Sequence, residues 1–530
     1  MFYTRFYSFL LSVCLFTGVS EAQDFEISSL GVFTYDDVTS DQKLNDVWGY
    51  AADGKEYALV GVWDGFSILD VTTPSNIVEK ARISGPSSVW RDIKTWDHYA
   101  YVSHDGVAGS SVDTAVGILI VDLNTLDSAE VTYTTFNYNG AMNRVHNIYI
   151  DENGVLYAFG SDYGVGGALM FDVSESEMSP TYIGEYNATY LHDGFARGDT
   201  LWGSSMFEGQ FIVLDVTDKM NPLSMGSHTT PNTFAHNCWP SDDNNYLFTS
   251  DEVSDATFAA YDVSDLSNIE LASTIQSSIS ELTIPHNTHF INDFIVNSYY
   301  RDGLQIVDVS RPDRMVEVGR FDCATNYQGN GFNGAWGAYP YLPSNNVLIS
   351  DMEMGLFVVQ PSYKRASFYE GVVVDITNDQ VIFGAEMVLN LDTVLSDFNG
   401  KFLFGQREDG LFGLTVNFSG YTEYTAQIDF LEGQTIQDTI FLEPIGFSLT
   451  ELEKSIELYP NPTRNIVYLN SPEFDINSYS IYGIDGSLVR NSNAVTFNGK
   501  IDVSILSSGL YLIELTGYDG VKVSKKFTVE

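Results

Sequence analysis

Basic residues are scarce in this chain, which has 25 lysines and arginines against 71 aspartates and glutamates. The formal net charge of −46 at pH 7 repels the phosphates of nucleic acids and of anionic membranes. The composition therefore argues against nucleic acid or a bare membrane surface as a partner. An acidic, solvated surface suits an exported protein, and it also leaves calcium binding open.

Long apolar runs and cysteines are also few. No segment of the mature chain reaches the about 18 apolar residues of a membrane-spanning helix, so we expect no transmembrane segment. Near the start, Arg5, a short apolar run at residues 9–16 and small residues up to Ala22 predict a secretory signal peptide at residues 1–22. Its removal takes away Cys14 and leaves Cys238 and Cys323, either as one disulfide or as two buried thiols.

Amphipathic helical patterns are nearly absent, whereas 44 glycines and an aromatic content of 14% indicate many short strands and tight turns. Residues 302–312 show a repeated unit in which Gly303 opens a turn, apolar residues form a strand, Asp308 interrupts it and Pro312 ends it. Copies of this unit occur at residues 64–72, 117–123, 168–174, 210–217, 259–264 and, in a worn form, 355–360.

The repeats are about 44 to 55 residues long, counted from a polar pair that precedes the first strand of each. The seven pairs are Asn45-Asp46, Arg91-Asp92, His146-Asn147, His192-Asp193, His236-Asn237, His286-Asn287 and, more weakly, Asn333-Gly334. Repeats of this length that consist of four strands indicate propeller blades. We therefore expect a seven-bladed β-propeller at residues 24–362.

The seventh repeat lacks a fourth strand of its own. Residues 27–34, directly after the signal peptide, have the pattern of a fourth strand and belong to no blade. We expect this segment to complete the seventh blade, so that the ring closes without a covalent link and leaves no long sheet edge exposed.

The repeat disappears after Arg365. Residues 366–445 alternate with a period of two, which predicts a small β-sandwich. A polar connector at residues 448–455 leads to a second small all-β module at residues 455–530. The predicted fold class is thus all-β, a seven-bladed propeller followed by two small β-sandwich domains.

The apolar-Asp-Val core of the repeats, as in residues 304–309, resembles that of LVIVD-repeat propellers. Together with the signal peptide and the C-terminal module, it is similar to the choice-of-anchor B group of secreted bacterial proteins. This resemblance covers residues 24–362 and implies a fold, with no reaction to carry over. The middle module resembles carboxypeptidase regulatory-like domains at residues 371–374, 382–385 and 397–402, which implies a spacer without catalytic activity.

The last module resembles a type A sorting domain of the type IX secretion system. The resemblance rests on Tyr-Pro-Asn-Pro at residues 459–462, Gly-Leu-Tyr at residues 509–511 and the final residues 526–530. It implies that residues 455–530 engage the type IX secretion machinery. The protein would then be released, or anchored to lipopolysaccharide at the outer-membrane surface.

Four of the eight histidines occupy the same position in consecutive repeats. In a propeller this position lies near the axis, on the face that also receives the acidic loops between the second and third strands. Imidazole with carboxylate is the donor mixture that zinc-like metals prefer, while the acids alone also suit calcium. The candidate ligands of a divalent metal, calcium or zinc, are His146, His192, His236, His286, Asp162 and Asp251.

An alternative is that each polar pair is a structural device, which ties the start of an inner strand to a turn of the adjacent blade. Imidazoles with carboxylates also suit acid–base chemistry. The aspartates that interrupt the repeated strands, such as Asp308, are interpreted as acceptors that tie turns. The chain contains no Gly-x-Ser-x-Gly elbow, phosphate-binding loop, dinucleotide fingerprint or His-Glu-x-x-His motif, so no catalytic residue is identified.

Two functions are consistent with these patterns. The first is a non-catalytic module at the cell surface or in the medium that binds an extracellular glycan or protein, for example in adhesion. The second is a metal-dependent hydrolase or lyase that uses the histidines and acids at the top of the channel. The missing catalytic motifs favour the first.

Overall fold

The computed structural model describes residues 24–106, 116–128, 130–277, 282–445, 453–471, 476–492, 499–518 and 520–530. The predicted signal peptide at residues 1–22, with Cys14, lies outside these ranges. The chain forms two compact units that divide near residue 363. Within the described ranges, no helix has both the length and the apolar character needed to cross a membrane.

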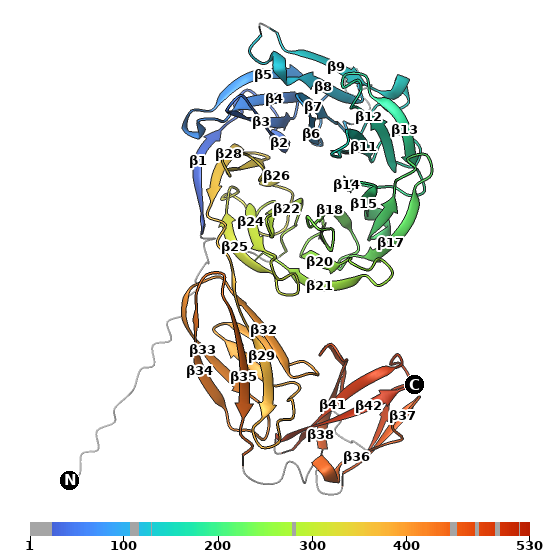
Figure 1. Ribbon diagram of the computed structural model, residues 1–530, viewed down its shortest axis with the longest axis vertical. Coiled ribbons are helices and arrows are strands. Elements are labelled where there is room, and N and C mark those ends of the chain that lie inside the picture. The colour runs from blue at the N-terminus through green and yellow to red at the C-terminus, as the bar shows by residue number, and fades with distance from the viewer. Residues whose placement is uncertain are drawn as a thin grey trace, which may run out of the picture. The chain divides into compact units, whose positions relative to one another are not determined.

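The first unit is a ring of seven four-stranded sheets, with the first strand of each repeat nearest the axis (Figure 1). Blade one consists of β2 (Leu44–Ala52), β3 (Lys55–Val62), β4 (Gly65–Asp70) and β5 (Val78–Ser84). Blade two consists of β6 (Ile93–Trp96), β7 (Tyr99–Val102), β8 (Ile118–Asp122) and β9 (Thr132–Phe136). Blade three consists of β10 (Asn147–Ile150), β11 (Val155–Phe159), β12 (Ala168–Asp172) and β13 (Thr181–Tyr186).

Blades four to six are β14 (Asp193–Arg197), β15 (Thr200–Ser205), β16 (Gln210–Asp215) and β17 (Leu223–Thr229); β18 (Ala235–Pro240), β19 (Tyr246–Asp251), β20 (Phe258–Asp262) and β21 (Glu270–Ile275); and β22 (Thr288–Ile291), β23 (Phe294–Ser298), β24 (Leu304–Asp308) and β25 (Val316–Phe321). Short 3-10 turns are η1 (Pro74–Asn76), η2 (Leu123–Thr125), η3 (Tyr138–Gly140) and η4 (Met206–Glu208).

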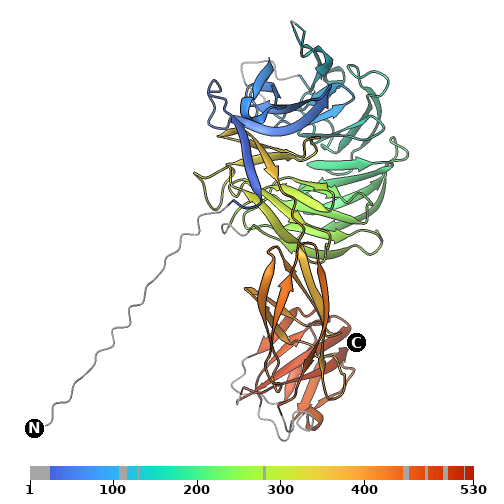
Figure 2. The same ribbon diagram turned by 60° about the vertical axis from the view of Figure 1, so that its left-hand side comes forward.

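The seventh blade confirms the predicted closure of the ring. Its sheet is β26 (Ala335–Tyr339), β27 (Val347–Asp351), β28 (Gly355–Pro361) and then β1 (Ile27–Phe33) from the start of the chain. The antiparallel register runs from Ile27 opposite Pro361 to Phe33 opposite Leu356. Figure 2 shows β1, in dark blue, along the edge of this blade. The seven blades therefore form a ring that is held closed by backbone hydrogen bonds.

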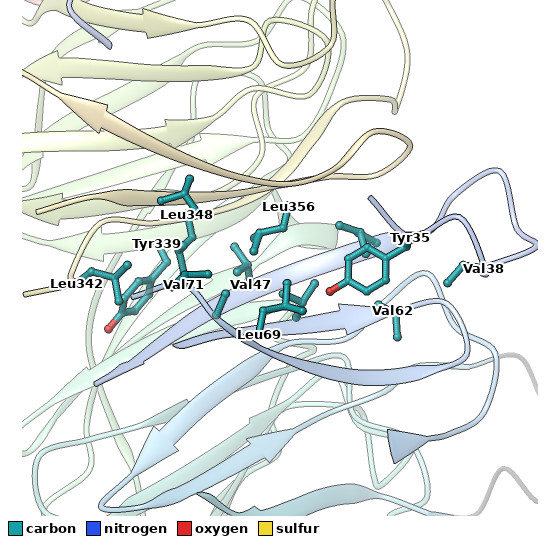
Figure 3. Packing of buried hydrophobic residues seen from close by; sticks show 14 residues of the cluster. Tyr35, Val38, Val47, Val62, Leu69, Val71, Tyr339, Leu342, Leu348 and Leu356 are labelled. Atoms are coloured by element: carbon teal, nitrogen blue, oxygen red, sulfur yellow. The ribbon is translucent and has the colours of Figure 1, made fainter. Parts of the chain in front are cut away.

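The hydrophobic core lies between adjacent blades. At the junction of blades seven and one, Tyr35 and Val47 pack with Leu348 and Leu356, and all four are at most 1% exposed (Figure 3). The Tyr35 hydroxyl donates to Ser67 Oγ at 3.1 Å, so the one polar atom of this ring has a partner. Burial of these side chains on both sides of the junction favours the closed ring over an open array.

The repeated unit has the geometry that its residue types predict. Asp308 Oδ1 accepts from the backbone N–H of Ser310 at 2.8 Å, and Asp70 does the same for Thr72 at 3.1 Å, so the interpretation of these acids as turn-tying acceptors is confirmed. Gly303 has a φ of +75°, and a Cβ there would lie 2.2 Å from the carbonyl oxygen of Phe321. Only glycine allows the third strand to begin this close to the fourth.

The two C-terminal modules are small β-sandwiches, as predicted. In the middle module, one sheet has the strand order β32 (Lys401–Gln406), β29 (Ser367–Asp375) and β35 (Thr435–Leu442). The other sheet has the order β31 (Asp392–Leu395), β30 (Glu386–Leu389), β33 (Gly410–Asn417) and β34 (Tyr424–Phe430). In the last module, one sheet has the strand order β36 (Glu457–Tyr459), β37 (Ile466–Asn470) and β40 (Lys500–Asp502). The other sheet has the order β39 (Leu488–Ser492), β38 (Ile476–Tyr482), β41 (Gly509–Gly517) and β42 (Lys522–Val529). Each module buries its own core between its two sheets.

The two cysteines of the described chain are free. Cys238 and Cys323 are both buried, and neither forms a disulfide. Burial raises the pKa of the Cys238 thiol to about 12, which keeps it protonated and unreactive. Of the two alternatives that the sequence left open, the structure therefore has the pair of buried thiols.

Candidate functional site in the propeller channel

The four aligned histidines form a continuous arc around the axis. They lie at the starts of β10, β14, β18 and β22, and the ring centroids of His146 and His192 are 4.1 Å apart. The next two separations, from His192 to His236 and from His236 to His286, are both 4.5 Å. The inner strands thus bring together the four imidazoles that the sequence singles out.

Trp336 continues the arc in the seventh blade, where the sequence alignment on Asn333-Gly334 is wrong by three residues. Ser298 Oγ donates to the carbonyl oxygen of Trp336, as Ser103 Oγ donates to that of His146. The Trp336 ring lies 4.7 Å from that of His286. The polar pair that marks the other repeats is absent here, because tryptophan and Gly337 occupy the two positions.

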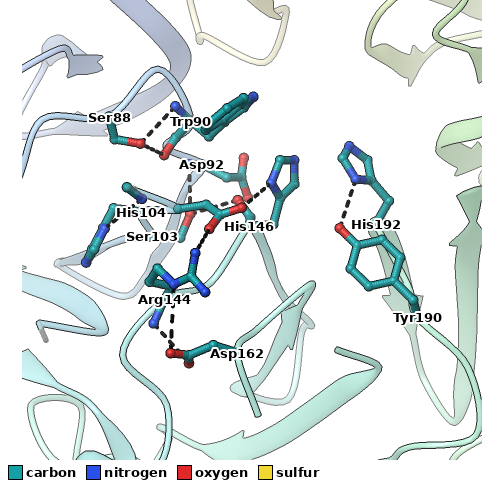
Figure 4. Close-up of polar contacts among 12 residues, drawn as sticks. Ser88, Trp90, Asp92, Ser103, His104, Arg144, His146, Asp162, Tyr190 and His192 are labelled. Carbon is teal, nitrogen blue, oxygen red and sulfur yellow. Dashed lines mark hydrogen bonds and ion pairs between the residues drawn. The ribbon is translucent and has the colours of Figure 1, made fainter. Parts of the chain in front are cut away.

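Three of the imidazoles have their Nδ1 atom held by a neighbour. Asp105 Oδ2 lies 3.2 Å from His146 Nδ1, the Tyr190 hydroxyl lies 3.3 Å from His192 Nδ1, and the Trp336 carbonyl lies 2.6 Å from His286 Nδ1. Figure 4 shows the rings of His146 and His192 facing one another, with Tyr190 beside His192. Holding Nδ1 in this way fixes the ring and leaves Nε2 for another partner.

Glu252 joins the arc from the loop after β19. Its Oε2 atom lies 3.6 Å from His236 Nε2 and its Oε1 atom 3.8 Å from His286 Nε2. The Tyr300 hydroxyl donates to Oε1 at 2.6 Å, so one carboxylate oxygen has a strong hydrogen bond. Within the described ranges, His192, His236 and Glu252 form the one group of three side chains whose ligand atoms lie within 4.8 Å of one another.

Asp162 and Asp251, expected among the metal ligands, have other roles. Asp162 Oδ1 accepts from the backbone N–H groups of Asn143 and Arg144, and so ties a loop of the third blade (Figure 4). Asp251 accepts from the Thr230 hydroxyl and from the N–H groups of Asn232 and Phe234. Each carboxylate is used by the backbone of its own neighbourhood, and neither belongs to the group around Glu252.

The imidazoles of His192, His236 and His286 are buried and neutral at physiological pH. Burial lowers the pKa of His236 and that of His286 to about 3, and the other imidazoles of the arc add to the effect. Burial likewise lowers the pKa of His192 well below 6.5. A neutral imidazole keeps a lone pair on one ring nitrogen, which is the form that binds a metal ion.

A ring of three aspartates and three asparagines, which we call the acidic ring, lies one residue further along the inner strands: Asp46, Asp92, Asn147, Asp193, Asn237 and Asn287. Lys94 Nζ lies 2.7 and 2.9 Å from the two carboxylate oxygens of Asp92, and Asp92 also accepts from the N–H of Ile148 in the next blade. Burial, with the nearby Asp92, raises the pKa of Asp46 well above its usual value and that of Asp193 to about 6. The second residue of the polar pair thus ties blades together, as the structural alternative predicted, whereas the first faces the channel.

An aromatic layer closes the channel below the acidic ring. The Trp239 ring lies 4.7 Å from Phe195 and 4.6 Å from His289, and Lys94 Nζ stands 4.4 Å from the centroid of Trp48. Trp239 and His289 are only 8% and 6% exposed. The cavity between the imidazoles and the acidic ring measures about 20 Å³, which is room for one water or one ion. A larger ligand can therefore reach only the side of the arc that faces the loops.

Two exposed phenylalanines stand at that side. Phe207 is 72% exposed and its ring lies 4.8 Å from Tyr190, which contacts His192. Phe332 is 50% exposed and lies 5.3 Å from Tyr300, which donates to Glu252. We call Phe207 and Phe332 the rim phenylalanines. His192, His236 and Glu252 together are called the imidazole–carboxylate group. Each rim phenylalanine contacts one tyrosine that is bound to this group, Tyr190 for Phe207 and Tyr300 for Phe332.

Sequence reasoning missed several residues of this site. Glu252 follows Asp251 directly, and nothing in the sequence indicates which of two adjacent acids turns toward the axis. Tyr190 precedes His192 by two residues, so a search of the sequence for hydrogen-bond partners near each histidine would find it. Phe207 lies in the 3-10 turn η4, and Tyr300 and Phe332 lie in loops. All three are outside the strand-forming unit defined above, so that unit offers no signal for them.

Two family models match parts of the chain. The LVIVD repeat matches residues 47–84 and 300–323, and the secretion system C-terminal sorting domain matches residues 457–530. The chain is an LVIVD-repeat propeller with a type IX C-terminal sorting domain, which indicates secretion to the cell surface or the medium and an interaction with the secretion machinery. The predictions of the repeat, the sorting domain and an extracellular location are confirmed.

No curated protein matches the chain. Among solved structures, the β-propeller domain of Myceliophteria thermophila Cps50 (Swd1) is similar at 12% identity and a TM-score of 0.43. The structure of U3-55K is similar at 9% identity and a TM-score of 0.45. In both cases the match covers 63% of this chain and 98% of the other.

Proposed function

We propose that the propeller is an extracellular ligand-binding module, with a role in adhesion, whose ligand is a glycan or a protein that docks on the loop side of the channel. The observation that carries this proposal is the pair of exposed rim phenylalanines beside the imidazole–carboxylate group. Exposed aromatic side chains next to polar groups are a frequent composition of binding surfaces. The 20 Å³ cavity limits what enters to one donor group, so the body of the ligand must lie across the rim.

The domain assignments support this reading and belong to the same proposal. Residues 24–362 form the binding module, residues 366–445 a carboxypeptidase regulatory-like spacer, and residues 455–530 a type A sorting domain. The whole would be a member of the choice-of-anchor B group. A spacer between a binding module and a sorting domain suits a protein that presents its ligand site away from the cell surface.

Replacing both rim phenylalanines by alanine tests the proposed site. We expect Phe207→Ala/Phe332→Ala to weaken binding of glycans or proteins selected on arrays with the wild-type chain by about 10-fold or more, because exposed aromatic anchors contribute over 1.4 kcal/mol. Met220→Ala/Leu223→Ala, which changes two exposed apolar residues in and near the outer strand β17, is the matched control. Equal Kd values for wild type and rim variant would contradict the proposed location.

A second candidate, a metal-dependent hydrolase or lyase, is favoured by the donor set itself. Two imidazoles with one carboxylate are a combination found in catalytic zinc sites, where the metal activates water. Turnover of an ester, peptide or glycoside panel that is lost with a chelator and restored by zinc would favour this candidate. A chain that binds its ligand and turns over nothing on the panel would favour the binding module.

A further inference from the structure

The geometry points to a specific metal centre, in which His192, His236 and Glu252 hold one divalent transition-metal ion of the zinc class. The inference deepens the proposed function, on which it rests, by naming the group that would meet the donor atom of the ligand. The three side chains come from successive blades or the loop beside them, and their ligand atoms lie within 4.8 Å of one another.

The carboxylate of Glu252 is short of hydrogen bonds. An ionised carboxylate accepts up to about four, and among the described residues one donor, the Tyr300 hydroxyl, lies within hydrogen-bond distance. The nitrogens of His236 and His286 lie 3.6 and 3.8 Å away, too far for a direct hydrogen bond. Donor atoms on a tetrahedral zinc are roughly 3.3 Å apart, so the 3.6 Å between His236 Nε2 and Glu252 Oε2 is close to the spacing of two ligands that share an ion.

His236 provides an independent indication. The residue is 4% exposed, and its Nε2 atom lies 3.6 Å from Glu252 Oε2, too far for a direct hydrogen bond. When the proton is on Nδ1, Nε2 carries the lone pair of the ring. A buried lone pair that faces a carboxylate oxygen at this distance is unfavourable unless a cation or a water lies between them.

The surrounding contacts orient the proposed ligands. Tyr190 holds Nδ1 of His192 at 3.3 Å and Tyr300 holds Oε1 of Glu252 at 2.6 Å. Metal-binding histidines and carboxylates commonly have such a second partner, which fixes the ring or the carboxylate toward the ion. His286 is fixed in the same manner by the Trp336 carbonyl, and it flanks the group without being needed to complete it.

The donor atoms select the class of metal. Calcium and magnesium take six or more oxygen ligands, whereas this group supplies two imidazole nitrogens and one carboxylate. Imidazole suits zinc and neighbouring transition metals. Of the two metals considered from the sequence, the structure thus favours zinc over calcium. Three protein ligands leave one position of a tetrahedral ion for water or for an atom of the bound ligand.

Metal content of the full-length secreted chain tests the inference. After chelation and reloading, we expect one zinc per chain by elemental analysis, and the visible absorption of tetrahedral cobalt when Co²⁺ replaces zinc. His236→Ala and Glu252→Gln should weaken zinc binding about 100-fold or more in a chelator competition, because losing a ligand costs at least as much as losing an outer partner. Tyr300→Phe removes the hydrogen bond that orients Glu252 and should weaken zinc binding by about 10-fold or more.

His289→Phe is the matched control, since it removes a buried channel histidine that lies in the aromatic layer and should leave zinc content at one per chain. A wild-type chain that retains no transition metal, or variants with unchanged affinity and intact folding by circular dichroism, would overturn the inference. The variant Phe207→Ala/Phe332→Ala distinguishes a failure of the metal centre from a failure of the proposed binding function. If that variant keeps zinc and loses the ligand, both stand; if the wild type binds ligand without zinc, only the metal centre fails.

Discussion

At the scale of single residues, His289 shows how a buried imidazole makes stability depend on pH. Its ring packs between Trp48, Trp239 and Tyr341, and its Nδ1 atom has no partner. Burial, with the nearby charge of Lys94, lowers its pKa from 6.5 to about 3. Between these values the unfolded chain binds a proton at this residue and the folded chain does not, so acid favours unfolding.

His289→Phe should therefore remove part of the acid sensitivity. The ring contacts remain, the unpaired nitrogen disappears, and the free energy of unfolding of the variant relative to wild type should rise by up to about 1.4 kcal/mol per pH unit as the pH falls from 6 to 4. Urea unfolding at pH 7, 6, 5 and 4 measures this difference. Asp193, whose raised pKa acts in the opposite direction, is common to both chains and cancels. A difference that does not change with pH would refute this role.

At the scale of elements, the strand β1 closes the ring, and its register can be tested by a cross-link. Ser28 and Gln360 are exposed and lie opposite one another in the β1–β28 pair. Opposite residues of an antiparallel pair have Cα atoms about 4.5–5.5 Å apart, which suits a disulfide. Ser28→Cys/Gln360→Cys should form this bond on oxidation and raise the free energy of unfolding by about 2–4 kcal/mol, because it joins the two ends of the propeller.

The control for this cross-link is a pair shifted by one residue. Ser29→Cys/Gln360→Cys places the two thiols on opposite faces of the sheet, because side chains alternate along a strand. Free-thiol titration and mass spectrometry should detect the bond in the first pair and not in the second. The native Cys238 and Cys323 are buried and do not compete. Efficient oxidation of the shifted pair would show that the register differs from the one described.

The elements also show how far the sequence leads. The ring closure is predictable because one repeat lacks a strand and one strand lacks a repeat. The start of the seventh blade is not, because Trp336 replaces the polar residue by which the other repeats are aligned. Likewise, the histidine arc is predictable from the repeat. The choice between the two adjacent acids is not, because Asp251 ends β19 and accepts from Thr230, and this leaves Glu252 to face the arc. Side-chain direction beyond a strand end depends on tertiary contacts that no periodicity encodes.

At the scale of the whole molecule, the sorting domain is separable from the site. In the described ranges, the sheets of the last module contain only β36 to β42, and its core residues all come from residues 456–529. No strand of the propeller or of the middle module pairs with them in those ranges. Removal of residues 457–530 therefore leaves the other cores intact, and a defect that follows must concern transport.

Deleting residues 457–530 should abolish export across the outer membrane in a host with a type IX secretion system. Because the sorting domain is the part that indicates use of this machinery, the truncated chain should accumulate in the periplasm while the full chain reaches the surface or the medium. Immunoblots of cell fractions measure the distribution. Deleting residues 366–445, which also form their own sheets, is the control and should leave export unchanged. Wild-type export of the first truncation would mean that the propeller or the middle module carries a sorting signal of its own.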